Sequence, residues 1–147
     1  MKILPSFKTL RPKKVLFLDA DGVINNAKTL NIDGWPIDPF CAFLVGRIVD
    51  RTDCAVVLSS SWRVIIEGRE TVANRVTPIF DVTDSGGSCR GEEIKDWLLD
   101  RNVERYAILD DDSDMLPEQQ EHFFKTSWEV GLTEEIANKV IEHLNEN

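Results

Sequence analysis

Four consecutive apolar residues, 15–18, end directly at Asp19, and Asp21 and Gly22 follow. An uninterrupted apolar run of this length, bounded by charged residues, is typical of a strand buried on both faces of a parallel sheet. Two acids at the end of such a strand are costly to bury unless a cation or a hydrogen-bond partner balances them. The chain must also turn at once for both side chains to reach one point, and glycine permits such a turn. The segment therefore predicts a buried strand that carries two carboxylates at its carboxyl end.

Further apolar runs alternate with helical patterns along the chain. Strands are expected at residues 15–18, 55–58, 78–82, 106–109 and 123–125, and helices at residues 38–50, after residue 62, and at 92–99, 115–120 and from 133 onward. Residues 20–37 are rich in Gly, Asn, Asp and Pro and are expected to form a loop, with a tight hairpin as one option. This alternation predicts an α/β, three-layer, Rossmann-like fold with a central parallel sheet. At 147 residues, one domain over residues 1–147 is expected, with residues 1–12 as a basic N-terminal segment.

Polar residues follow three of these strands at the point where each one ends. They are Asp19 and Asp21 after the first strand, Ser59, Ser60, Ser61 and Arg63 after the second, and Asp110, Asp111, Asp112 and Asp114 after the fourth. The carboxyl ends of parallel strands meet at one edge of the sheet, so we expect these groups to converge. Grouped carboxylates repel one another unless a cation is present, and oxygen ligands without His or Cys suit Mg²⁺. Hydroxyls and an arginine beside the metal suit the oxygens of a phosphate.

Composition excludes several classes of protein. The net charge of −9 and the pI near 4.7 disfavour non-specific binding along a nucleic-acid backbone, which normally needs a basic stripe. Recognition of one phosphorylated end by a few local charges remains compatible with this charge. No apolar run approaches the roughly 20 residues needed to cross a bilayer, and no secretory signal pattern follows Lys2, so no membrane partner is expected. The three cysteines lack paired spacing, which indicates reduced thiols, a cytoplasmic location and no disulfide-linked partner.

The order of four segments resembles one known family. The segments DADGV, SSSWR, RGEEIKDWL and ILDDDSDM follow one another as do the motifs of the haloacid dehalogenase (HAD) superfamily of phosphatases. The resemblance implies that Asp19 is a covalent nucleophile and metal ligand, and that Asp21 is the general acid/base and binds metal through its backbone carbonyl. It further implies that Ser59, with Ser60 beside it, holds the phosphoryl group. Asp110 and Asp111 would be the late acids, with Asp111 as the favoured direct ligand of Mg²⁺, and Asp114 would hold a metal-bound water.

The basic residue of the third motif has two candidates. The family normally places a lysine just before a helix, whereas this chain has Arg90 there and Lys95 inside the expected helix. Helical spacing sets Lys95 on the flank of the inward stripe, so Arg90 is favoured as the phosphate-binding cation. Arg63 is a second candidate for substrate binding, with a surface ion pair as its alternative role.

The short intervals between the motifs indicate which subgroup of the HAD superfamily the chain resembles. Only 37 residues separate Asp21 from Ser59 and 28 separate Ser61 from Arg90, which leaves no room for a substantial cap domain. The resemblance extends to the HAD domain of nucleic-acid end-repair proteins and to the phosphatase half of polynucleotide kinase-phosphatase. It therefore implies a phosphorylated substrate such as a nucleic-acid 3′-phosphate end.

Three alternative functions remain open. They are a phosphoprotein or small-metabolite phosphatase of the same fold, a receiver-like signalling module, and a catalytically inactive binding module. A positively charged surface formed beside the acids by Lys13, Arg63 and Arg90 would favour the hypothesis of a nucleic-acid substrate.

Overall fold

A five-stranded, all-parallel sheet lies at the centre of the computed structural model, which describes residues 12–146. In spatial order the strands are β3 (Asp81–Val82), β2 (Ala55–Leu58), β1 (Lys14–Leu18), β4 (Arg105–Asp110) and β5 (Phe123–Lys125). The α/β parallel-sheet prediction is confirmed. The expected basic segment, residues 1–12, lies outside the described residues except for Pro12.

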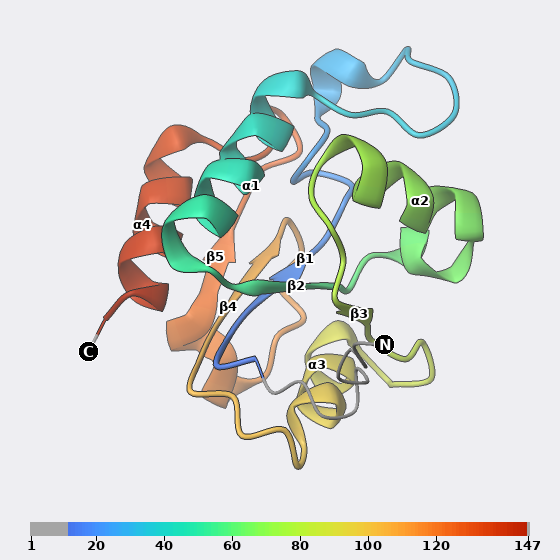
Figure 1. Ribbon diagram of the computed structural model, residues 1–147. Coiled ribbons are helices and arrows are strands. Elements are labelled where there is room, and N and C mark those ends of the chain that lie inside the picture. Colours follow the sequence, from blue (N-terminus) through green and yellow to red (C-terminus); the bar gives the residue numbers. More distant parts are fainter. Residues whose placement is uncertain (1–11, 147) are drawn as a thin grey trace, which may run out of the picture.

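Helices cover both faces of the sheet and complete three layers (Figure 1). On one face lie α1 (Pro39–Thr52), α2 (Ile66–Arg75) and α4 (Glu134–Leu144), and on the other lies α3 (Arg90–Leu98). Among residues 12–146, three short 3₁₀ helices complete the elements: η2 (Ala27–Thr29), η3 (Ser61–Val64) and η4 (Pro117–His122). Because residues 15–18 of β1 are buried on both faces of the sheet, they contribute alternately to two separate cores.

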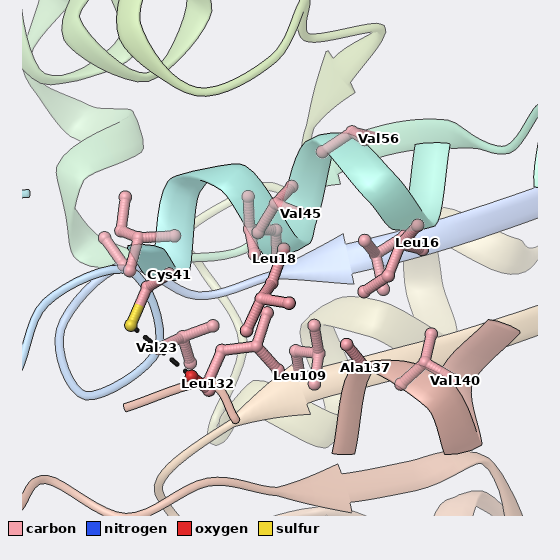
Figure 2. Packing of buried hydrophobic residues seen from close by; sticks show 14 of the residues in the cluster. Leu16, Leu18, Val23, Cys41, Val45, Val56, Leu109, Leu132, Ala137 and Val140 are labelled. Atoms are coloured by element: carbon pink, nitrogen blue, oxygen red, sulfur yellow. Dashed lines mark hydrogen bonds between the residues drawn. The ribbon is translucent and has the colours of Figure 1, made fainter. Parts of the chain in front are cut away.

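The larger core lies between the sheet and helices α1 and α4. Figure 2 shows Leu18 of β1 and Leu109 of β4 packed among side chains such as Val45 of α1 and Val140 of α4. Burying each aliphatic side chain of this size contributes about 1.5–3 kcal/mol relative to exposure. The smaller core packs Phe17 of β1 against the indole of Trp97 on α3, edge to face at 5.5 Å between ring centroids. These contacts hold α3 against one face of the sheet, near the carboxyl end of β1.

The helix starts follow from local sequence. Asp38 caps α1, since its Oδ1 accepts hydrogen bonds from the backbone N–H groups of Phe40 and Cys41, and Pro39 occupies the first helical turn. Thr133 caps α4 in the same way. These caps start both helices where the sequence predicts them.

Two segments differ from the expected secondary structure. The third strand is only Asp81–Val82, because β3 is an edge strand that pairs with β2 over two residues. The segment between β1 and α1 forms the short helix η2, capped by Asn26, in place of a hairpin. The three cysteines are free thiols, with Cys41 and Cys54 buried. Within residues 12–146, no helix is both long enough and apolar enough to span a membrane.

Candidate active site

Sheet register brings the ends of three strands together. Leu18 of β1 pairs with Leu58 of β2 and with Leu109 of β4. The next residues are therefore neighbours: the Ser59 N–H donates to the Leu18 carbonyl at 2.9 Å, and the Asp19 N–H donates to the Leu109 carbonyl at 3.0 Å. This register places Asp19 at the centre of the carboxyl edge, between the end of β2 and the end of β4.

Three carboxylates gather at this point. Each of Asp19, Asp110 and Asp111 offers one oxygen, and the three oxygens lie within 4.8 Å of one another. Asp19 and Asp110 are buried and Asp111 is half-buried. An all-oxygen set of this kind fits a hard divalent cation, because such ions prefer carboxylate ligands. The predicted convergence of the strand-end acids thus holds for these three residues.

The two adjacent late acids have different surroundings. The Oδ1 of Asp110 accepts a hydrogen bond from the Asp112 N–H at 2.9 Å, and its Oδ2 accepts one from the Arg90 guanidinium at 2.9 Å. The Asp111 carboxylate instead lies against the backbone of Gly22, where a β-carbon would overlap it. Gly22 also has a φ of +79°, a conformation that favours glycine. Asp110 is therefore held by protein donors, whereas Asp111 faces the turn after β1.

The carboxyls of the cluster resist ionisation. Burial and then the charge of Asp110 raise the pKa of Asp19 from 3.8 to about 8, although the Arg90 guanidinium opposes this rise. Burial also raises the pKa of Asp110 and of Asp111. Bringing a cation to the cluster would favour the charged carboxylates, so these shifts agree with the chemistry of the donor set.

Arg90 is the cation that meets these acids. Its Nη1 lies 2.9 Å from Asp110 Oδ2 and 3.4 Å from Asp19 Oδ1. Arg90 reaches them because it is the first residue of α3, whose start points at the ends of β1 and β4. Lys95 lies farther along α3, is exposed, and makes an ion pair with Glu118 at 3.9 Å. Of the two candidates for the third motif, the structure brings Arg90 into the cluster.

One family model matches most of the chain. Residues 15–137 match the model described as "HAD domain in Swiss Army Knife RNA repair proteins". The chain belongs to this HAD family. No curated protein and no solved structure gives a significant match. The family assignment agrees with the parallel sheet and supports a hydrolase of the phosphatase type, and HAD proteins generally use a metal ion of the kind that the acidic cluster could hold.

This HAD domain carries no large insertion between its first strands. The interval from β1 to β2 holds a loop with η2 and then α1, and the interval from β2 to β3 holds η3 and α2. The carboxyl edge of the sheet is therefore flanked by short elements over residues 12–146, as the motif spacing predicted.

The serines after β2 differ in their hydrogen bonding. The Ser59 hydroxyl is fully buried and has no hydrogen-bond partner among the described residues. The Ser60 hydroxyl accepts a hydrogen bond from the Trp62 N–H at 3.1 Å and so caps η3. A buried hydroxyl without a partner is costly, so such groups usually have a hydrogen-bond partner when the protein is functional. The Ser59 hydroxyl is therefore free to bind a ligand.

Arg63 does not extend toward a substrate, contrary to the sequence-based expectation. The side chain is buried, and its five N–H groups donate to the carbonyls of Ser59, Ser60, Thr83 and Asp84 and to the carboxylate of Glu93. All five donors of a guanidinium are thereby used. Arg63 instead ties the end of β2 to the segment after β3, because these two chain segments leave several carbonyls without strand partners.

The remaining predicted acids lie at the edge of the cluster. Asp21 is exposed, and its Oδ1 accepts a hydrogen bond from Asn25 Nδ2 at 3.0 Å. Asp114 accepts a hydrogen bond from the Arg90 N–H through Oδ2 at 3.0 Å, and its backbone carbonyl accepts one from Gly91. Asp114 therefore holds the first turn of α3 through Oδ2 and its carbonyl, and its expected contact with a metal-bound water stays a prediction.

Lys13, Arg63 and Arg90 do not lie together beside the acids, so the arrangement that would favour a nucleic-acid substrate is not present in residues 12–146. Lys13 precedes β1 and so lies at the opposite, amino end of the sheet, whereas Arg90 lies at the carboxyl end. Arg63 is enclosed by protein acceptors. Local positive charge at the cluster thus comes from Arg90, and charge alone does not favour a nucleic-acid substrate.

Three buried polar residues near the site were not identified from the sequence. Asn25 accepts the Gly22 N–H at 2.9 Å and donates to Asp21. Gln119 of η4 donates to the Gly91 carbonyl at 2.9 Å and accepts from Leu116. Glu93 accepts a hydrogen bond from Arg63 and makes an ion pair with Arg90. Only Glu93 had a sequence signal: it precedes Trp97 by four residues and therefore shares the inward face of α3.

Proposed function

We propose that this protein is a Mg²⁺-dependent phosphomonoesterase that works through an aspartyl-phosphate on Asp19. The observation that carries the proposal is the position of Asp19, which lies between a buried unpaired hydroxyl and a guanidinium and beside two further carboxylates. A carboxylate nucleophile, donors for the phosphoryl oxygens and ligands for a metal are thus present at one sheet edge.

In the first step, a carboxylate oxygen of Asp19 attacks phosphorus, and the bond from phosphorus to the ester oxygen breaks. Arg90 Nη1 lies 3.4 Å from Asp19 Oδ1, so it holds that oxygen and leaves Oδ2 as the attacking atom. The guanidinium also faces the place where negative charge develops on the phosphoryl oxygens.

Asp21 exchanges the proton in both steps. It first donates a proton to the departing ester oxygen, and its carboxylate then removes a proton from the water that attacks the aspartyl-phosphate. The second step releases inorganic phosphate and restores the Asp19 carboxylate. Asp21 suits this role because it is exposed to solvent and oriented by Asn25.

The phosphoryl group is held from the β2 side by the Ser59 hydroxyl, which is buried and has no partner among the described residues. Ser60 contributes by fixing the turn into η3 through its bond to the Trp62 N–H. On the other side, Arg90 supplies the charged donor.

Mg²⁺ would be held by Asp19, Asp110 and Asp111, with the backbone carbonyl of Asp21 as a further ligand. When bound, the ion supplies positive charge that neutralises the carboxylates and polarises a phosphoryl oxygen. Asp111 is the favoured direct ligand because both oxygens of Asp110 already accept hydrogen bonds from protein groups.

The substrate we propose is the phosphorylated end of an RNA strand, with the 3′-phosphate as the favoured position. Support comes from the printed description of the family, which refers to RNA repair proteins, and from the short segments around the site. An end held by one phosphate needs few basic residues, which is compatible with the net charge of −9. A phosphoprotein or a small phosphorylated metabolite is the alternative, and the acidic pI favours it.

The test is phosphate release with Mg²⁺ and with chelator, for wild type and Asp19→Asn. The panel contains RNA and DNA oligomers phosphorylated at the 3′ or the 5′ end, a phosphopeptide and small sugar phosphates. We expect Mg²⁺-dependent and Asp19-dependent release from the RNA 3′ end. Release only from peptides or sugar phosphates would overturn the proposal of an RNA substrate in favour of the alternative. Retained activity in Asp19→Asn would overturn the proposed mechanism.

A further inference from the structure

Glu93 is a buried acid that lies between two arginines. Its Oε1 accepts a hydrogen bond from Arg63 Nη2 at 3.0 Å and lies 3.6 Å from Arg90 Nε. The Glu93 side chain is 9% exposed. A carboxylate this buried is stable only when it is paired, and here one oxygen serves both guanidinium groups.

The Arg63 side of this arrangement is fixed to the backbone. The other N–H groups of Arg63 donate to the carbonyls of Ser59, Ser60, Thr83 and Asp84, at distances of 2.6–3.4 Å. Arg63 therefore cannot follow a movement of Glu93 without losing bonds to the ends of β2 and β3. Glu93 is held from this side at a constant place relative to the sheet edge.

The Arg90 side of the arrangement faces the reactive carboxylate. Glu93 lies at the Nε edge of the Arg90 guanidinium, and Asp19 and Asp110 lie at its Nη1. A guanidinium is a rigid planar fork, so fixing the Nε edge also fixes the direction in which the Nη groups point. In helical terms Glu93 is one turn after Arg90, within reach of the same side chain.

Packing supports the same position for Glu93. A β-carbon on Gly87 would lie 2.6 Å from Glu93 Cγ, so the loop between β3 and α3 closes directly over the side chain. Glu93 also separates two positive groups, and without its charge Arg63 and Arg90 would repel each other. Both effects act on the orientation of Arg90.

From these contacts we infer that Glu93 is a positioning residue that aims the Arg90 guanidinium at Asp19 and at the phosphoryl group. This role rests on the proposed phosphatase function. Glu93 itself contacts arginines rather than the reacting atoms, so it acts through Arg90.

A double-mutant cycle tests the inference. Glu93→Gln keeps the size of the side chain and an acceptor for Arg63 but removes the charge. We expect kcat to fall by about 10-fold to 100-fold with a smaller change in KM, and Glu93→Gln to cost little more when Arg90→Ala is already present. Equal losses in both backgrounds, or a wild-type rate for Glu93→Gln, would overturn the role.

The matched control is Glu92→Gln, which removes the same charge from the same first turn of α3. It should leave kcat unchanged, because within residues 12–146 the contacts to Arg63 and Arg90 come from Glu93 and not from Glu92. A general effect of charge at the helix start would instead lower kcat in both variants. If Glu93→Gln fails to fold, Gly87→Ala displaces the Glu93 side chain without changing charge and should lower kcat in the same direction. A wild-type rate in folded Gly87→Ala would then contradict the inference.

A second readout does not depend on catalysis. The Arg90 Nε–H signal in ¹⁵N NMR, assigned through Arg90→Lys, should exchange slowly with water in wild type and in Glu92→Gln, and faster in Glu93→Gln. Unchanged exchange in Glu93→Gln would refute the contact. If wild type releases no phosphate from any substrate while this NMR pattern holds, the proposed function fails and the positioning contact stands.

Discussion

The backbone of Gly22 lies directly against the carboxylate of Asp111, so that any β-carbon at position 22 would overlap it. The two residues lie in the segments that follow β1 and β4, and their contact closes the acidic cluster. Gly22 is held there by the Asn25 side chain, which accepts its N–H, and by Thr126 Oγ1, which donates to its carbonyl at 2.5 Å.

Gly22→Ala should therefore disrupt the cluster. The added methyl group must displace Asp111, and the φ of +79° is strained for alanine. We expect a loss of about 1–3 kcal/mol in the free energy of unfolding and weaker Mg²⁺ binding, measured by urea unfolding and by calorimetry. Gly46→Ala is the control, because its β-carbon would meet open space on α1; equal effects of the two variants would contradict the prediction.

Asn25 should matter for turnover through Asp21. Its fully buried amide donates to Asp21 Oδ1 at 3.0 Å and to the Pro36 carbonyl at 3.1 Å. Asn25→Ala releases the Asp21 side chain, and we expect kcat to fall by about 10-fold or more, since a positioned acid/base contributes about 10²–10⁴-fold. Steady-state kinetics on the preferred substrate measures this. A kcat equal to wild type in the folded variant would show that Asp21 needs no support from Asn25.

Arg90→Ala and Lys95→Ala should separate the two candidates for the third motif. Removing Arg90 leaves the buried carboxylate of Asp110 without its 2.9 Å partner, at a cost of up to about 3 kcal/mol in metal-free protein. Lys95 is exposed and pairs at 3.9 Å, so its removal should change stability by less than about 0.5 kcal/mol. Phosphatase activity should follow the same order. A larger activity loss for Lys95→Ala would transfer the role to Lys95.

The metal-free protein should become less stable as pH rises from about 4 to about 8. The pKa of Asp19 is raised from 3.8 to about 8 in the folded state, so in this window the folded state binds more protons than the unfolded chain. The free energy of unfolding therefore falls with increasing pH, and the contribution of this group is fully present only below about pH 4. Urea unfolding in chelator at a series of pH values measures the slope.

Asp19→Asn should flatten this slope and stabilise the metal-free protein at pH 8 relative to wild type. Adding Mg²⁺ should stabilise wild type more at pH 8 than at pH 5, because a cation favours the ionised cluster. Asp33→Asn, at an exposed position, serves as the control. A wild-type slope in Asp19→Asn would remove Asp19 as the source of the pH dependence.

The strand that ends at Asp19 was predictable because its signal is local. Residues 15–18 are apolar without interruption and the acids follow immediately, so burial and chain direction can be read from adjacent residues. The same holds for the caps Asp38 and Thr133, whose side chains bond to N–H groups two or three residues later. Parallel strands have their carboxyl ends at one edge of the sheet, so the sequence was enough to predict that the acids at positions 19, 110 and 111 lie close together.

Arg63 shows where the sequence stopped being sufficient. An arginine after a strand end can bind a phosphate or fill a structural role, and the choice depends on the carbonyls of Thr83 and Asp84, which are 20 or more residues away in the chain. Glu93 likewise depends on Arg63, which is 30 residues away in the chain. The sequence by itself determined the sheet, its direction and the acidic edge, because these follow from local burial patterns. Only the tertiary structure decided which charged side chains face that edge and which support it, because that depends on long-range pairing of buried donors and acceptors.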